Sequence, residues 1–243
     1  MANLVAVDNK SHRKVQIDTS KLALHGAGLN MVPVVLSEFT NAAVQYPLAL
    51  TKNGDTGAFV FVALLGFEAG ENLFWQNGQW QGLYLPLQIK RQPFFVGNPN
   101  ANNQAVTKNG DHIVCIDSQS PAITTQGGMA LFDERGLETE FFQEVKTCLA
   151  HMLNGELANK NLIDNLLKMD LLQSMSLKIT FVNQVSTRLN GLYTVDQDKL
   201  AKLKDDQVLQ LHKLGLLGAI HTLITSLAQV QTLIDLKNQR LEG

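Results

Sequence analysis

The sequence contains few of the features that identify a reaction or a cellular compartment. Its 243 residues include 2 cysteines and 2 tryptophans, and the formal net charge is −2. Cys115 and Cys148 lie far apart without paired-ligand spacing, so we expect free, buried thiols rather than a disulfide framework or a zinc site. A nearly balanced charge provides no basic surplus for nucleic acid. We therefore expect no nucleic-acid partner.

Long apolar runs are also missing. The longest, residues 58–67, is far shorter than the ~20 residues that span a bilayer. Residues 1–15 lack the apolar core of a signal peptide. These two absences predict a soluble, cytoplasmic protein with no membrane span, whose 45% hydrophobic content suffices for a sizeable core.

Local patterns of reaction chemistry are absent as well. The 6 histidines show none of the spacings typical of a metal site. The sequence has no Gly-x-x-x-x-Gly-Lys-Ser/Thr phosphate loop and no Gly-x-Ser-x-Gly nucleophile elbow. We expect no cofactor, no metal and no catalytic residue from local sequence, while distant segments remain free to converge on a site that no short motif indicates.

Residues 1–136 have the patterns of strands and turns. A short helix is predicted over residues 37–46, where a serine can cap its start and a proline follows its end. Residues 48–51 and 58–65 are β-like runs around Asn53-Gly54, a dipeptide that favours a tight hairpin turn. The second run is apolar on both faces, which is typical of a strand in the interior of a sheet.

A second hairpin is predicted at Asn77-Gly78, with Trp75 and Trp80 on opposite arms. A helix is expected to begin at Leu85 and to stop before Pro93. The pentad of the first hairpin recurs at residues 107–111 before another apolar run, and we attribute this repeat to two similar turns rather than to a duplicated domain.

Residues 137–243 are mainly helical. We predict a helix that ends near Asn154-Gly155 and a second one to about residue 172. Two strands follow, one on each side of a turn at Asn190-Gly191, and the tail closes with a long helix over residues 216–237. The whole chain is thus predicted to be one domain over residues 1–243 of the α+β class, with a mixed or antiparallel sheet from the N-terminal half covered by helices of the C-terminal half.

The densest cluster of aromatic and polar side chains lies between Gly66 and Pro93. Aromatic faces together with a carboxylate, an amide and a guanidinium can stack and orient a peptide side chain or a small polar ligand. We predict a ligand- or partner-binding surface that contains Glu71, Asn72, Trp75, Trp80, Tyr84 and Arg91. The structural alternative is that the tryptophans fasten a hairpin to the core and that Glu71 and Arg91 form one ion pair.

The same stretch resembles the SapC family of bacterial proteins. The residues that carry the resemblance are Glu38, Tyr46-Pro47, Leu64-Leu65-Gly66, Glu71-Asn72-Leu73-Phe74, Gly78, Trp80, Tyr84, Pro86, Arg91 and Pro93-Phe94. Weaker similarity extends over most of the chain. An unrelated transporter permease shares the family's name, and the missing membrane spans argue against it. Where relatives often have a second arginine, this chain has Lys90, so bidentate anion recognition would depend on Arg91.

The resemblance implies a partner role rather than a reaction. The family's name comes from a link to surface-layer protein export, and relatives are often encoded beside halogenase-like enzymes, cupin-like proteins and outer-membrane receptors. We therefore expect a non-enzymatic accessory protein that binds a peptide, a small polar ligand or a protein, such as a neighbouring-gene enzyme or an export component. The alternatives are an enzyme or enzyme subunit that uses Glu71 as an acid–base group, and a structural homo-oligomer joined through the C-terminal helix at Ile224 and Leu227.

Overall fold

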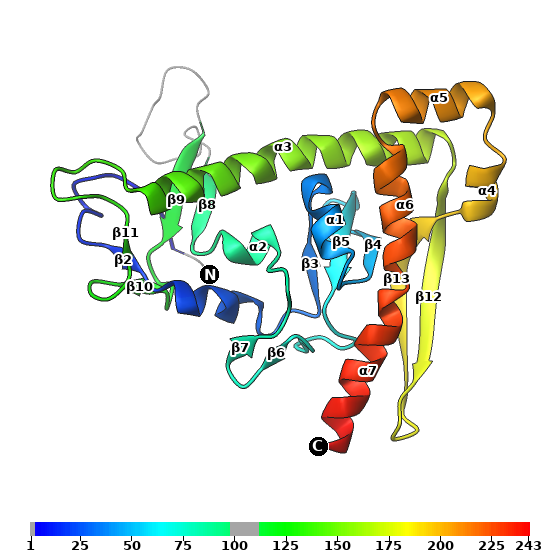
Figure 1. Cartoon of the computed structure of the whole chain (residues 1–243), viewed down its shortest axis with the longest axis horizontal. Helices are drawn as coiled ribbons and strands as arrows, with labels where there is room; N and C mark the ends of the chain where they lie inside the picture. Colours follow the sequence, from blue (N-terminus) through cyan, green and yellow to red (C-terminus); the bar gives the residue numbers. More distant parts are fainter. Residues whose placement is uncertain (1–2, 98–111) are drawn as a thin grey trace. The chain divides into compact units, whose positions relative to one another are not determined.

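The computed structural model describes residues 3–97 and 112–243 of the chain. They form two compact units, each of which takes residues from both halves of the sequence (Figure 1). Of the described residues, one unit contains 3–25, 87–97 and 112–153, and the other contains 26–86 and 154–243. We call them unit 1 and unit 2. Both combine antiparallel strands with helices, so the predicted α+β class is confirmed.

Unit 2 is built on a five-stranded antiparallel sheet of order β12-β13-β4-β5-β3. Its strands are β12 (Leu172–Thr180), β13 (Ser186–Val195), β4 (Leu48–Lys52), β5 (Phe59–Leu64) and β3 (Met31–Pro33). The hairpin of β4 and β5 is confirmed, and β5 lies inside the sheet as its apolar pattern predicted. The short helices η2 (Leu36–Glu38) and α1 (Phe39–Ala42) replace the single helix expected before β4.

At two of the predicted Asn-Gly turns in unit 2, the chain does not form the expected tight turn. Residues 53–58 connect β4 to β5, and the positive φ of 68° falls at Gly57 rather than at Gly54. Asn190-Gly191 lies inside β13, where the pairing with β12 shifts register and leaves two residues of β13 opposite one residue of β12. Gly191 adopts a φ of 77° there. In both cases a turn-forming dipeptide serves another purpose, in a longer loop and in a β-bulge.

The predicted break at Asn154-Gly155 is wrong, because one helix, α3, runs without interruption from Glu140 to Lys168. Gly155 lies inside it, where an added Cβ would be 2.5 Å from the Cβ of Val35. The glycine therefore permits close packing of the helix against the segment after β3 instead of ending the helix. Close helix packing and helix termination both favour glycine, which is why the sequence pattern was ambiguous.

The expected long C-terminal helix is divided in two. The tail contains α4 (Gln197–Ala201), α5 (Asp205–Lys213), α6 (Leu217–Ser226) and α7 (Gln229–Glu242). The break follows Ser226, whose buried hydroxyl donates to Leu223 O at 2.7 Å and accepts from Leu48 N at 2.9 Å. Helix α6 packs against β13, β4 and α1. Taken together, residues 217–242 are long and apolar enough to cross a bilayer, a property that buried helices of soluble proteins share.

Unit 1 contains two small antiparallel sheets. Their strands are β1 (Leu4–Ala6), β9 (Ile113–Asp117) and β8 (Phe94–Gly97) in one, and β10 (Ile123–Thr124), β2 (Gln16–Ile17) and β11 (Met129–Ala130) in the other. The 3-10 helix η1 (Thr19–Gly26) and the short helix α2 (Leu87–Lys90) complete the elements. The repeated pentad at 107–111 falls outside the described residues. A cluster that includes Phe94, Ile116, Phe132 and Phe142 forms the buried core.

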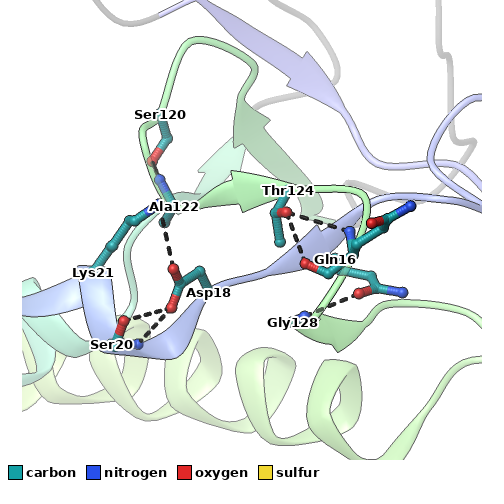
Figure 2. Close-up of polar contacts among 9 residues, drawn as sticks. Gln16, Asp18, Ser20, Lys21, Ser120, Ala122, Thr124 and Gly128 are labelled. Carbon is teal, nitrogen blue, oxygen red and sulfur yellow. Dashed lines mark hydrogen bonds and ion pairs between the residues drawn. The ribbon is translucent and has the colours of Figure 1, made fainter.

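The strand β2 is held by polar contacts to the chain that follows β9 (Figure 2). Asp18 N donates to Ala122 O at 2.8 Å, and Gly128 N donates to Gln16 Oε1 at 2.9 Å. A Cβ at Gly128 would lie 2.7 Å from Ile17 O, so only glycine fits this crossing. The polar contacts in this region connect neighbouring strands and turns of unit 1.

Candidate functional site

The candidate site begins with a small hairpin in unit 2. Strands β6 (Trp75–Gln76) and β7 (Gln79–Trp80) pair so that Trp75 lies opposite Trp80. Asn77 and Gly78 have φ angles of 52° and 76°, and positive φ at both central residues is the requirement that Asn-Gly satisfies best. This predicted hairpin, with one tryptophan on each arm, is therefore confirmed.

Trp80 packs on the core of unit 2. Its ring stacks against Phe74 at a centroid distance of 6.4 Å, while the Tyr46 ring meets Phe74 edge-on at 4.8 Å. Tyr46 and Phe74 are buried, whereas Trp75 and Trp80 are half-buried. Such aromatic contacts contribute about 0.5–1.5 kcal/mol each beyond area burial. The rings thus fasten the hairpin and still present part of their surface to solvent.

The loop after β7 is fixed through the carbonyl of Tyr84. Tyr46 donates its hydroxyl hydrogen to Tyr84 O in a short hydrogen bond, and Trp80 Nε1 donates to the same oxygen at 3.2 Å. Burial raises the pKa of the Tyr46 hydroxyl, an effect that the hydrogen bond with Trp80 opposes in part. Tyr46 consequently stays protonated and remains a donor at physiological pH.

The side chain of Tyr84 is engaged as well. Its hydroxyl donates to Glu38 Oε1 at 2.9 Å, and the other carboxylate oxygen of Glu38 accepts from Val35 N at 2.9 Å. Glu38 is buried, with an exposed fraction of 2%. Both carboxylate oxygens of Glu38 are therefore engaged, and the hydrogen bond from Tyr84 anchors the loop to this buried residue.

Leu83 projects from this fixed loop. Its backbone N–H donates to Gln45 Oε1 at 2.7 Å. The preceding Gly82 has no room for a side chain, because a Cβ would collide with Trp80 Nε1 and the Tyr46 hydroxyl. Nevertheless the leucine itself is 89% exposed. Val44, next to Gln45 in the chain, is 64% exposed. The loop is immobilised by its backbone while its apolar side chain is left in solvent.

Glu71 is paired with the C-terminal helix. Its Oε1 accepts from Lys237 Nζ at 2.5 Å, and its Oε2 accepts from Phe67 N at 2.9 Å. Both side chains of the ion pair are 12% exposed. Lys237 also lies 3.6 Å from Glu68 Oε1. Because both carboxylate oxygens are engaged, Glu71 could act as a general acid or base only after release of its partners.

Asn72 holds the backbone around itself. Its Nδ2 donates to Gly26 O at 2.7 Å and its Oδ1 accepts from Phe74 N at 2.8 Å. The residue is buried, with an exposed fraction of 2%. The backbone carbonyl oxygens of Asn72 and Trp75 both accept from Arg240 Nη2 at 3.0 Å. The amide of Asn72 therefore shapes the loop before β6 and has no exposed atoms to offer a ligand.

Arg91 belongs to unit 1, whereas the other predicted site residues belong to unit 2. Its Nε donates to Gln88 Oε1 at 3.0 Å and its Nη1 donates to Phe94 O at 2.6 Å. The guanidinium lies over the Phe95 ring, 4.1 Å from the centroid. The neighbouring Lys90 is exposed. Helix α2 ends at Lys90, and Arg91, the next residue, packs against the strand that follows.

A histidine–serine contact in unit 1 was not predicted from the sequence. His25 Nε2 lies 3.3 Å from Ser120 Oγ. Burial lowers the pKa of His25, while Asp117 acts to raise it and Arg91 to lower it. Ser120 is buried and its Oγ also accepts from Ala122 N at 3.2 Å. The two residues are distant in the sequence, so no local pattern could indicate the contact, and the turn hydrogen bond gives Ser120 a structural role.

The predicted site residues therefore differ in what they can offer a partner. Trp75, Trp80 and Tyr84 keep part of their surface exposed, while Glu71 and Asn72 are occupied by intramolecular contacts. Within residues 3–97 and 112–243, no group of three or more His, Cys, Asp or Glu side chains is arranged to hold a metal ion. Cys115 is buried, as expected, whereas Cys148 is half-buried.

The comparisons with known proteins give one match. The family model described as SapC matches residues 7–233, which is nearly the whole chain and includes both units. No curated protein and no solved structure matches the chain.

Proposed function

The chain belongs to the SapC family, and from this premise we propose that it is a non-enzymatic accessory protein that binds a protein partner through an aromatic-rich surface centred on Leu83. The surface comprises Val44, Trp75, Trp80, Leu83 and Tyr84, and we call it the Leu83 surface.

The observation that carries the proposal is the exposure of Leu83 on a fixed loop. A single exposed leucine is common on protein surfaces. The backbone of Leu83 is held by the hydrogen bond that its own N–H donates. The following residue, Tyr84, is held by hydrogen bonds at its backbone carbonyl and at its side-chain hydroxyl. An apolar side chain on a flexible loop can fold back onto the protein, whereas Leu83 is kept 89% exposed. Such pre-organisation lowers the entropic cost of binding.

The shape of this surface favours a folded protein over a small ligand. Small ligands bind in concave sites that bury most of their surface, while Leu83 projects outward. A projecting leucine requires a partner that supplies an apolar pocket. The half-buried Trp75, Trp80 and Tyr84 next to it in the chain are residue types that dominate binding energies at protein interfaces. We place the interaction in the cytoplasm, with a neighbouring-gene enzyme or an export component as the partner.

Site-specific photo-crosslinking tests the proposal. A benzophenone amino acid at position 83 is expected to form a covalent adduct with the partner when the protein is expressed in its native host. The same amino acid at position 157 is the control, because Leu157 is also strongly exposed, at 71%, but lies on α3.

The outcomes of this experiment separate the alternatives. An adduct with one defined protein from position 83 and none from position 157 supports the proposal. Adducts only between two copies of the chain would favour a homo-oligomer instead. An equal pattern from both positions, or no adduct from position 83, would contradict a specific partner surface there.

A further inference from the structure

The loop before β6 carries a cluster of oxygen acceptors in unit 2. The carboxylates of Glu68 and Glu71 and the carbonyl oxygens of Asn72 and Trp75 all face the end of helix α7. The helix and this loop meet in Figure 1. We call residues 68–75 the acceptor loop.

Two cations of α7 occupy the acceptor loop. Lys237 Nζ bonds Glu71 Oε1 at 2.5 Å and lies 3.6 Å from Glu68 Oε1. Arg240 Nη2 donates to the carbonyl oxygens of both Asn72 and Trp75 at 3.0 Å. Lysine and arginine three residues apart lie on one face of a helix. The acceptor loop therefore fits the cationic face of a helix, with carboxylates for the lysine and carbonyl oxygens for the arginine.

The end of α7 is attached by polar contacts. Besides Lys237 and Arg240, Asn238 Oδ1 accepts from Val182 N at 3.0 Å. Residues 239–243 are exposed, and the apolar Leu241 among them is 40% exposed. The fully buried residue of this helix, Leu233, lies before this region. Opening the last turns would thus expose little apolar surface, and segments of this kind have a low free energy of local opening.

We infer that the acceptor loop is a binding site for a cationic helix face with lysine and arginine at positions i and i+3, and that the last turns of α7 are its exchangeable intramolecular occupant. This site shares Trp75 with the Leu83 surface, but it uses the backbone carbonyl oxygen of that residue rather than its ring, and it does not depend on the proposed function. An intramolecular occupant acts at an effective concentration in the millimolar range. A second helix therefore binds well only when α7 is released or when its own affinity is higher.

A peptide of residues 229–243, labelled with a fluorophore, tests this inference in trans. The receptor is the full chain with Lys237→Ala and Arg240→Ala, in which the two cationic side chains no longer occupy the acceptor loop. We call it the vacated variant. We expect this variant to bind the peptide at least tenfold more tightly than the wild-type chain does, as measured by fluorescence anisotropy. A peptide that carries the same two alanine substitutions is the matched control and is expected to lose binding.

A third receptor locates the site. Adding Glu68→Gln and Glu71→Gln to the vacated variant is expected to abolish binding of the wild-type peptide, while circular dichroism stays unchanged. Equal binding of both peptides, or equal binding to wild-type and vacated chains, would overturn the inference.

The wild-type chain provides a test that does not depend on the folding of any variant. Unlabelled peptide at millimolar concentration is expected to raise hydrogen–deuterium exchange of residues 237–242, because the peptide displaces them. The alanine-substituted peptide is expected to leave exchange unchanged. Unchanged exchange with the wild-type peptide would overturn the inference.

Discussion

The ion pair between Glu71 and Lys237 lends itself to a double-mutant cycle. Lys237→Met removes the cation and keeps an unbranched side chain beside the Phe181 ring, whose centroid lies 5.6 Å from Nζ in the wild-type protein. Glu71→Gln removes the negative charge but keeps a side-chain oxygen that can accept from Phe67 N, as Glu71 Oε2 does at 2.9 Å. The two changes therefore separate the ion pair from the loop hydrogen bond.

The exposure of the pair sets the expected magnitude. Breaking a fully buried pair costs about 3–5 kcal/mol, and an exposed pair contributes about 0–1 kcal/mol. Both side chains are 12% exposed, so we expect Lys237→Met to lower the free energy of unfolding by about 2 kcal/mol after allowing for screening. The double variant with Glu71→Gln is expected to recover about half of this loss, because no partly buried charge is then left without its partner.

Urea denaturation of the wild type, both single variants and the double variant measures the coupling free energy. By the usual scaling, Lys237→Met also lowers Tm by about 4–8 °C. Lys160→Met is the control, because its pair with Asp164 is exposed, with side-chain fractions of 73% and 57%, and should change stability by less than about 0.5 kcal/mol. Additive losses in the double variant, or a loss for Lys237→Met no larger than that of the control, would refute the reasoning.

Three further predictions concern packing, the fixed loop and pH. Gly155→Ala should destabilise the protein by about 1–3 kcal/mol, since its Cβ would lie 2.5 Å from that of Val35. Gly218→Ala in α6 has no atom within 4 Å of the added Cβ and should stabilise the protein by up to about 1 kcal/mol. Thermal unfolding of both variants checks this contrast. Tyr46→Phe should cost about 1 kcal/mol in urea denaturation through the lost hydrogen bond to the loop, and an unchanged midpoint would contradict that contribution. Burial lowers the pKa of His25 from its ordinary 6.5, so the unfolded state binds the proton first as the pH falls, and stability should decrease below about pH 6.5. The Tm values at pH 7.5 and 5.5 should differ less in His25→Gln than in the wild type. An equal pH dependence in both proteins would exclude this histidine as the cause.

The sequence predicted those elements of the fold that depend on local periodicity. The apolar run of β5 and the Asn77-Gly78 hairpin are where the pattern placed them. The errors occur where one residue type has two uses. Gly155 permits close packing inside α3, and Gly191 forms a bulge inside β13. The patterns had predicted the end of a helix at Gly155 and a turn between two strands at Gly191. Only the tertiary neighbours, such as Val35 for Gly155, distinguish these uses.

The candidate site was predictable as a segment and not as an arrangement. Aromatic density marked the residues around Trp75 and Trp80, but the exposed Leu83 has no signal of its own, since its importance lies in the hydrogen bonds that fix its backbone. The partner of Glu71 is Lys237, at the opposite end of the chain. An ion pair between segments so distant in sequence leaves no local pattern, and the nearby Arg91 was therefore the natural expectation.

The central claim is that Leu83 is an anchor for a protein partner, and the dissociation constant of the partner crosslinked from position 83 tests it most directly. Leu83 is 89% exposed, and burying a leucine contributes about 1.5–3 kcal/mol, so Leu83→Ala should weaken binding about tenfold to a hundredfold. Leu157→Ala, which removes a leucine that is 71% exposed on α3, should leave the dissociation constant unchanged. Equal dissociation constants for the wild type and Leu83→Ala would contradict the claim.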